Sequence, residues 1–390
     1  MSPISADAQS PYILALVPEA FGGHGGIALY MRDVLGCLAA RHDRPLVTLI
    51  ARGGSVESAE LPANIRCEQG ALRGKWAFAG SVLKSILRKR KPRLIVCGHI
   101  NLLPFARLAA VCTRAPMVLF IYGIDAWEPP RATLARKLAA SADLILSISE
   151  LTRQRFLAWS GVDPRKVGLL PNAIKLERYS TGPKNPALLS RYGIEGRTVL
   201  MTLGRLWSVQ RHKGIDEIIE VLPRLLEEFP NLVYLVAGGG DDIERLGRKA
   251  DELGVGDRVI FTGMVDELEK ADHYRLADAF ALAGRGDGFG FVLLEAMACG
   301  IPVVASVLDG TQEAVLNGEI GVLVNPDEPA SLVRGLTEAL RRPKSIPEQL
   351  AYFSYDRFCG RLRDALEPMT DRPTSLRQPQ REVNGQGLTR

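Results

Sequence analysis

The chain has 390 residues, of which 46% are hydrophobic and 24% are charged. This composition is typical of an ordinary soluble protein and excludes a mainly disordered, collagen-like or disulfide-stapled chain. The net charge is only +5, yet residues 1–185 carry 25 Lys and Arg against 13 Asp and Glu (+12), whereas residues 186–390 carry 24 against 31 (−7). The two halves are therefore expected to face different partners.

No leader peptide or membrane span is expected. Residues 1–10 lack a basic segment, and the apolar run at 12–17 is too short for a signal peptide. No apolar run approaches the roughly 18 residues that a spanning helix needs. The six cysteines, at 37, 67, 97, 112, 299 and 359, form no C-x-x-C pair. We therefore expect ordinary buried thiols in a reducing cytoplasm.

The first half alternates short apolar runs with amphipathic segments. Helices are predicted over 27–40 and 75–90, and strands at 12–17, 45–51, 93–97, 117–122 and 143–147. Continuous apolar runs of this length are typical of parallel strands that are buried on both faces. Their alternation with helices predicts a doubly wound α/β domain.

The second half repeats this arrangement. Its helices are predicted over 215–228, 291–298 and 330–340, and its strands at 198–203, 232–237, 259–261, 279–283, 302–305 and 321–324. A stretch with Pro, Gly and Asn at 171–196 separates the halves, so we place the domains at 1–185 and 186–350. Residues 351–367, with a helix over 352–366, are expected to pack back toward the N-terminal domain. Residues 368–390 are expected to be a disordered tail.

A glycine-rich loop, F-G-G-H-G-G at 21–26, follows the first predicted strand and precedes a helix. Glycines at such a position let backbone amides approach a phosphate at the helix N-terminus. The spacing is not G-x-G-x-x-G, and the second strand is followed by R-G-G instead of an acidic residue. An NAD site is therefore disfavoured. A tight turn without a ligand is the alternative.

Two cations follow a strand of the second half. Arg205 lies in the G-R-L segment at 204–206, and Lys213 precedes Gly214 at the start of a predicted helix. Positive charge at this place suits a diphosphate leaving group, because negative charge builds there as the bond breaks. Taken alone, they could equally be two solvated surface bases.

The most specific motif is D-G-F-G-F-V-L-L-E-A-M-A-C-G-I-P-V-V at 287–304. It places Asp287 in a glycine-rich loop, and Glu295 about two turns along the helix that follows. A charge in an otherwise apolar helix is costly unless it is paired or liganded. A capped helix with one salt-bridged glutamate is the alternative interpretation.

Residues 12–366 resemble the retaining glycosyltransferases of family 4, which have the GT-B fold of two Rossmann-like doubly wound α/β domains facing across a cleft. The family pattern E-G-F-G-x-x-x-x-E-A-M-A-x-G-x-P-V matches residues 287–303, with Asp in place of the first Glu. Further segments match its Gly-Gly-Ile loop, its diphosphate-binding pair and its G-G-x-x-E and G-x-L-V motifs: 22–27, 204–214, 307–313 and 321–324.

The resemblance implies a donor site in the second domain, with four expected catalytic residues. Arg205 and Lys213 would neutralise the nucleoside diphosphate, Glu295 would bind the ribose hydroxyls, and Asp287 would hold hydroxyls of the transferred sugar. The donor is also expected to contact Gly23, Gly25, Gly26, Gly204, Met264, Gly288, Phe289, Gly290 and Phe291. Such enzymes need no metal, so neither a metal nor another cofactor is expected, and the nucleotide-sugar is a co-substrate.

Two positions depart from the family pattern. Asp287 is one methylene shorter than the usual Glu, which changes its reach by about 1.5 Å. Tyr122 stands where the family often has a histidine, in Y-G-I-D at 122–125, and a tyrosine does not titrate near pH 7. We expect His99, Tyr122 and Asp125 to lie near the acceptor or the sugar. For His99, a structural hydrogen bond is the alternative.

The segment at 72–93 is basic and amphipathic, and it carries no acidic residue. Such a segment is typical of a membrane-surface helix, and each base near an anionic leaflet contributes about 1 kcal/mol. Its expected membrane-facing residues are Arg73, Lys75, Trp76, Lys84, Arg88, Lys89, Arg90 and Lys91. A solvated helix face is the first alternative. A nucleic-acid patch is the weaker one, and no nucleic-acid partner is expected.

The sequence thus predicts a retaining hexosyltransferase that moves a sugar from a UDP- or GDP-sugar to a glycan or lipid-linked acceptor. Its expected place is the inner face of the cytoplasmic membrane, in the synthesis of a cell-surface polysaccharide or glycolipid. Retention at the anomeric carbon agrees with the motifs, because they contain neither an evident general base nor a nucleophile. Positioning and electrostatics are then expected to carry the reaction. The alternatives are an epimerase or phosphorylase on the same scaffold, or a non-catalytic nucleotide-sugar-binding protein.

Overall fold

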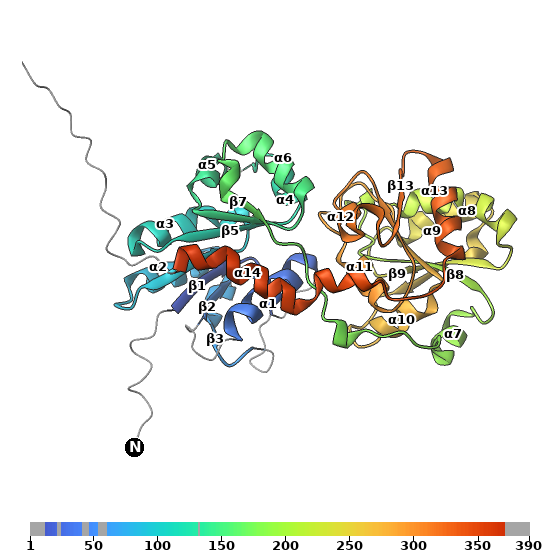
Figure 1. Cartoon of the computed structure of the whole chain (residues 1–390), viewed down its shortest axis with the longest axis horizontal. Coiled ribbons are helices and arrows are strands. Elements are labelled where there is room, and N and C mark those ends of the chain that lie inside the picture. Colours follow the sequence, from blue (N-terminus) through green and yellow to red (C-terminus); the bar gives the residue numbers. More distant parts are fainter. Residues whose placement is uncertain (1–11, 22–24, 41–46, 54–60, 132, 371–390) are drawn as a thin grey trace, which may run out of the picture.

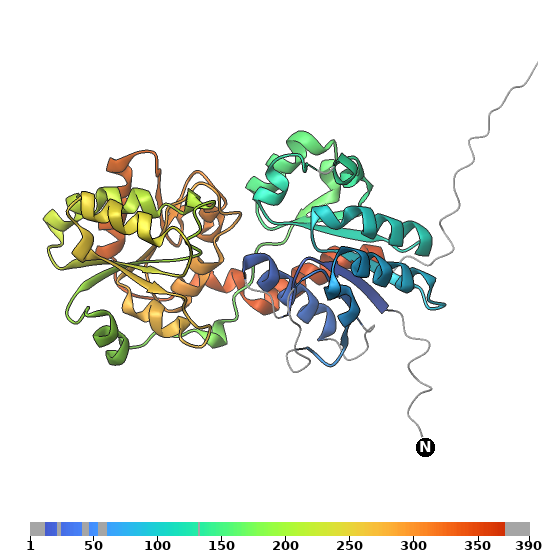
Figure 2. The same cartoon turned by 180° about the vertical axis from the view of Figure 1, so that it is seen from behind.

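Two parallel β-sheets, each flanked by helices, organise the chain (Figures 1 and 2). The computed structural model describes residues 12–370, except residues 22–24, 41–46, 54–60 and 132. This architecture confirms the predicted pair of doubly wound α/β domains. Most of the predicted disordered tail lies outside the described residues, but residues 368–370 continue the last helix.

The first sheet has seven strands in the order β3-β2-β1-β4-β5-β6-β7. Their bounds are β1 Tyr12–Val17, β2 Val47–Ala51, β3 Ile65–Cys67, β4 Pro92–Cys97, β5 Met117–Ile121, β6 Leu144–Ser147 and β7 Val167–Leu169. β1 is buried along its whole length, as its unbroken apolar sequence predicts. Since β2 and β4 lie on opposite sides of β1, the loops after β1 and β4 diverge, which is where doubly wound sheets bind ligands.

The second sheet has six strands in the order β10-β9-β8-β11-β12-β13. Their bounds are β8 Thr198–Leu203, β9 Leu232–Ala237, β10 Val259–Gly263, β11 Ala279–Leu282, β12 Val303–Ser306 and β13 Val322–Val324. Here the winding reverses between β8 and β11. The two sequence motifs with cations and carboxylates follow these two strands.

The helices of the N-terminal half are α1 Gly26–Ala39, α2 Lys75–Leu87, α3 Leu103–Thr113, α4 Ile124–Trp127, α5 Thr133–Leu138 and α6 Glu150–Ser160. The second half begins with α7 Pro186–Tyr192. Those that follow are α8 Ile215–Glu228, α9 Ile243–Glu252, α10 Lys270–Leu276, α11 Phe291–Ala298, α12 Thr311–Ala314, α13 Pro329–Arg341 and α14 Tyr355–Thr370. The starts of two of these helices have clear local causes. The hydroxyl of Ser149 accepts a hydrogen bond from the Thr152 amide and caps α6. Gly214, at φ 81°, begins α8 where a side chain would collide with the Ala283 carbonyl.

The C-terminal segment crosses from the second domain to the first (Figure 1). Where a single helix over 352–366 was predicted, the structure has a 3₁₀ helix at Glu348–Phe353 followed by α14. The two are separated at Ser354 because the chain pairs there with Ile174, whose amide donates to the Phe353 carbonyl at 2.8 Å. α14 then packs against α1.

A disulfide joins Cys37 of α1 to Cys359 of α14, with the Cα atoms 5.3 Å apart. The prediction of ordinary unpaired thiols is therefore wrong for these two residues. The pair could not be read from spacing, because 322 positions separate the cysteines and only the return of α14 to the first domain brings them together.

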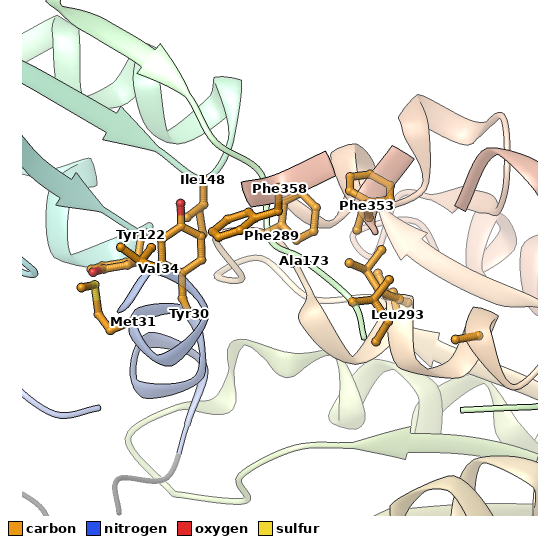
Figure 3. Close-up of a cluster of buried hydrophobic side chains, with 14 of the residues drawn as sticks. Tyr30, Met31, Val34, Tyr122, Ile148, Ala173, Phe289, Leu293, Phe353 and Phe358 are labelled. Atoms are coloured by element: carbon orange, nitrogen blue, oxygen red, sulfur yellow. The ribbon is translucent and has the colours of Figure 1, made fainter. Parts of the chain in front are cut away.

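Aromatic rings join the core of one domain to that of the other (Figure 3). Tyr30 of α1 meets Tyr122 and Phe358 edge-on, at centroid distances of 5.4 and 5.5 Å. Phe289, from the motif after β11, meets Phe353 in the same way at 5.6 Å. The C-terminal segment therefore contacts both the motif loop of the second domain and the core of the first.

Candidate functional site

The two halves of the candidate site meet through backbone contacts. Gly288, after β11, lies so close to the Tyr122 carbonyl and to Gly123 that neither glycine has room for a side chain. The loop after β5 therefore touches the loop after β11 across the domain boundary. Asp287 lies on the second of these loops, and Asp125 lies in α4, directly after the first.

Lys213 and Asp287 form an ion pair in which both side chains are largely buried, with 18% and 14% of their surfaces exposed. Lys213 comes from the 3₁₀ turn Arg211–Lys213 before α8, so the fold joins two motifs that are 74 positions apart. The Oδ2 atom of Asp287 is buried and has no hydrogen-bond partner among the described residues. A carboxylate with an unused acceptor atom beside a cation is suited to a ligand that carries both hydroxyls and negative charge.

The backbone of Asp287 is fixed on both sides by the segment after β12. Its amide donates to Asp309 Oδ2 at 3.0 Å, and its carbonyl accepts from the Gly310 amide at 2.8 Å. Asp309 is fully buried, and burial together with the charge of Asp287 raises the pKa of Asp309 to about 6. Asp309 lies inside the matched segment 307–313, but no feature of that segment singles it out.

Arg205 is exposed, and its guanidinium lies over the Trp207 ring at 5.6 Å from the centroid. It has no carboxylate partner among the described residues. Together with Lys213 and Arg211 it lines a small pocket after β8. Arg211 pairs with Asp242 at 3.5 Å. This pocket therefore presents several cations, of which Arg205 is exposed and has no carboxylate partner among the described residues.

His212 lies between these cations and was not predicted as a site residue. Its ring packs against Gly286, which leaves no room for a side chain at that glycine. Burial and the neighbouring charge of Lys213 lower the pKa of His212. His212 directly precedes Lys213 in the sequence, whereas its packing against Gly286 depends on the tertiary fold.

Glu295 is 1% exposed and takes part in a buried polar cluster. It accepts a hydrogen bond from the Tyr274 hydroxyl at 2.5 Å and pairs with Lys270 at 2.9 Å. Burial lowers the pKa of Lys270, but the charges of Glu295 and Glu267 outweigh this and raise it overall. The alternative of a single salt-bridged glutamate therefore describes part of what is seen.

The remaining expected donor contacts come from several loops and helix starts of the two domains. Met264 follows β10 and is 80% exposed, whereas Phe289 is buried. Gly290, at φ 87°, precedes α11, whose first residue is Phe291. Three other glycines are placed by the fold: Gly204 follows β8, and Gly25 and Gly26 begin α1. Gly23 lies outside the described residues.

Three residues were expected near the acceptor or the sugar. The Nδ1 of His99 accepts from the Asn101 amide at 3.1 Å, and burial and Arg52 lower the pKa of His99. The Tyr122 hydroxyl is buried and donates to the Gly98 carbonyl at 2.9 Å. Asp125 accepts from the Tyr122 amide at 3.2 Å, has a buried Oδ2 without a partner among the described residues, and has its pKa raised to about 7 by burial.

The basic segment forms α2, which ends at Leu87 instead of the predicted 90. Trp76 is 86% exposed, and its neighbours include further exposed apolar and basic side chains: Lys75, Leu83, Lys84, Leu87, Lys89 and Lys91. Arg88 pairs with Glu68 at 2.5 Å, and Arg90 stacks over Tyr12, so both are half-buried. The side chain of Arg73 lies outside the described ones.

Within the described ranges, no helix is long and apolar enough to cross a membrane. Over the same residues, no group of three or more His, Cys, Asp or Glu side chains is arranged to hold a metal ion.

Comparisons with known proteins match both halves of the chain. The family profile "Glycosyl transferase 4-like domain" matches residues 25–173, and "Glycosyl transferases group 1" matches residues 190–357. A solved structure of Anabaena Alr3699/HepE in complex with UDP and glucose aligns with a TM-score of 0.73 at 22% identity, covering 92% of this chain and 99% of that one. The galactosyltransferase WaaB aligns with a TM-score of 0.69 at 19% identity, covering 91% and 99%.

Curated relatives are similar over part of their length. A Mycolicibacterium smegmatis "GDP-mannose-dependent alpha-(1-6)-phosphatidylinositol monomannoside mannosyltransferase" is 34% identical over 62% of this chain and 66% of its own. A Geodermatophilus obscurus "D-inositol 3-phosphate glycosyltransferase" is 32% identical over 55% and 49%. The matches thus span about half to two thirds of these relatives. With both halves matched and the two-domain fold shared, the chain belongs to the family 4-type glycosyltransferases with the GT-B fold.

Proposed function

We propose that this chain transfers a hexose from a nucleoside-diphosphate sugar to a hydroxyl acceptor, with retention at the anomeric carbon. The observation that carries the proposal is the Lys213–Asp287 pair with its unpartnered Oδ2. Lys213 has three N–H donors, so its bond to Asp287 leaves others for phosphate oxygens. Asp287 Oδ2 is available to accept a hydrogen bond from a sugar hydroxyl.

In the proposed reaction the protein supplies charge and position. Arg205 and Lys213 oppose the negative charge that builds on the diphosphate as the glycosidic bond breaks. Asp287, held by Asp309 and Gly310, orients the sugar for attack. The acceptor hydroxyl attacks the anomeric carbon from the side of the leaving group, and a phosphate oxygen of that group takes its proton. No metal or other cofactor takes part in this proposal.

The proposed ribose contact uses Glu295. Lys270 and Tyr274 each bind one of its oxygens. A carboxylate accepts about four hydrogen bonds, and Tyr179 also hydrogen-bonds Glu295, so the acceptor capacity that remains is proposed for a ribose hydroxyl. Lys270 lies 2.9 Å from this buried carboxylate and holds it in place.

For the donor, we propose that GDP-mannose be tested first, with UDP-sugars second. Relatives at 33–34% identity bear names that specify GDP-mannose. The structure with bound UDP and glucose is only 22% identical, so it supports the fold and not the choice of base. The contacts proposed for diphosphate and ribose are the same for both nucleotides.

For the acceptor, we propose a lipid-linked polyol or glycan at an anionic membrane surface. Exposed Trp76 on α2, with apolar and basic neighbours, supports this. α3 packs beside α2 and adds exposed Leu108 and Val111. A lipid headgroup acceptor is consistent with relatives whose names specify phosphatidylinositol.

The test is turnover with GDP-mannose, UDP-glucose and UDP-galactose, each with vesicles of phosphatidylcholine alone or with 30% phosphatidylinositol. Release of nucleoside diphosphate coupled to a new glycolipid with the donor's anomeric configuration supports the proposal. An inverted product refutes retention. Conversion of one nucleotide-sugar into another indicates an epimerase, and binding without turnover of any donor indicates a sensor.

A further inference from the structure

A short segment after β12 makes contacts in both domains. It runs from Asp309 to Glu313 and includes the first residues of α12, which begins at Thr311. Asp309 lies at one end, against the motif loop of the second domain. Glu313 lies at the other end, against the first domain. The two ends are four residues apart, which is about one helical turn.

The Asp309 end is internally tied and holds Asp287. Asp309 Oδ1 accepts from the Thr311 amide at 3.0 Å and from its hydroxyl at 2.6 Å. The Thr311 hydroxyl in turn accepts from the Ser306 amide at 2.9 Å, which anchors the turn to β12. The other oxygen of Asp309 receives the Asp287 amide. Asp309, Thr311 and Ser306 are fully buried, so this end is rigid.

The Glu313 end binds the start of α6 in the opposite domain. Its carboxylate accepts from the Glu150 amide at 2.7 Å and from the Leu151 amide at 3.0 Å. First-turn amides of a helix have no partner within the helix and carry its positive dipole end. Such charge-assisted bonds are about twice as strong as neutral ones. This contact therefore holds the two domains together at one defined place.

We propose that Glu313 is a positioning residue that couples contact between the domains to the placement of the Asp287 carboxylate. The inference rests on the proposed function, because it assigns a consequence for sugar transfer. One rigid turn has Asp287 bonded at one end and α6 at the other. When Glu313 is engaged, Asp287 is held at the domain boundary, and when α6 is released, the turn and Asp287 lose that support.

The test compares Glu313→Gln with the wild type. The amide keeps the shape of the side chain but loses its charge, and one of its two ends becomes a donor that cannot accept from an amide. We expect kcat to fall at least about tenfold, because charge-assisted bonds are lost. The KM for the donor should stay within about twofold, because Arg205 and Lys213 are untouched. Glu319→Gln, an exposed acid nearby, is the matched control and should change neither value.

Hydrogen exchange gives a readout that does not need activity. In Glu313→Gln, a peptide over 148–153 should exchange faster, because the Glu150 and Leu151 amides lose their acceptor. A peptide over 285–291 should also exchange faster if the two ends of the segment from Asp309 to Glu313 are coupled. Asp309→Asn, at the other end, should lower kcat and loosen 148–153 in return, because coupling is reciprocal.

Three results would overturn the inference. The first is unchanged hydrogen exchange at 148–153 in Glu313→Gln. The second is faster exchange at 148–153 while exchange at 285–291 and kcat both stay unchanged. The third is a rise in the KM for the donor at constant kcat. A wild-type protein that turns over no nucleotide-sugar refutes the proposed function alone. The exchange of the two peptides then still decides whether Glu313 is coupled to the Asp287 loop.

Discussion

Removing the bond between Cys37 and Cys359 should destabilise the N-terminal domain by about 2–4 kcal/mol. The chain-entropy relation for a loop of 322 residues gives an upper value of roughly 6 kcal/mol at 298 K. The second domain lies inside this loop. If it remains folded while the first unfolds, the effective loop is shorter, and the same relation gives about 5 kcal/mol. Measured disulfide contributions are typically about 2–4 kcal/mol, which is the range expected here.

The assay is urea unfolding of Cys37→Ser/Cys359→Ser against the wild type, followed by tryptophan fluorescence. Three of the four tryptophans, at 76, 127 and 159, lie in the N-terminal domain, so the signal reports mainly on that domain. Cys112→Ser removes an exposed thiol and is the matched control. Titration of the unfolded, unreduced chain should find four thiols, rising to six after reduction. Six thiols before reduction, or equal midpoints for the double variant and the wild type, would refute the reasoning.

Four further predictions concern the site and the surface. Lys213→Ala should lower kcat about 10²–10³-fold in a transfer assay, since it removes charge that opposes the leaving group; an unchanged kcat contradicts that role. Lys270→Met should destabilise the protein by about 3–5 kcal/mol in urea, because the buried Glu295 loses its cationic partner, and adding Glu295→Gln should restore much of the loss. The pKa of Asp125 is raised to about 7 by burial, so the folded state binds its proton more tightly and stability should fall by about 1 kcal/mol from pH 6 to pH 8; Asp125→Asn should remove that part of the slope. Trp76→Ala should reduce flotation with anionic vesicles at low salt while leaving flotation with neutral vesicles low, and equal flotation of variant and wild type argues against α2 as the membrane surface.

Long apolar runs made much of the fold predictable. β1, β8 and β9 have the predicted bounds, because central strands of a parallel sheet are buried on both faces and tolerate no polar interruption. The edge strands β3 and β7 were missed. Each has three residues, and an exposed residue, Arg66 or Leu169, interrupts the apolar pattern. A strand this short has too few positions for periodicity to show.

The site was predictable where it rests on motifs and not where it rests on packing. Arg205, Lys213 and Asp287 follow β8 and β11, where the winding rule puts ligand-binding groups. Lys270 and Asp309 come from other elements, and nothing in their local sequence shows that they meet Glu295 and Asp287. Those contacts depend on side-chain packing between segments that are 22 and 25 positions apart.

The return of α14 has a consequence for the order in which the protein is made. Phe358, Leu362 and Leu366 are buried in a core that they share with α1 and β1, elements near the other end of the sequence. During synthesis the core of the first domain is therefore complete only after the whole second domain and α14 have been translated. At a typical 5–20 residues per second, the roughly 180 residues between the first domain and α14 take about 10–35 seconds. For that period α1 presents an apolar face to the cell, which makes this surface the one that a chaperone acting on the growing chain would have to cover.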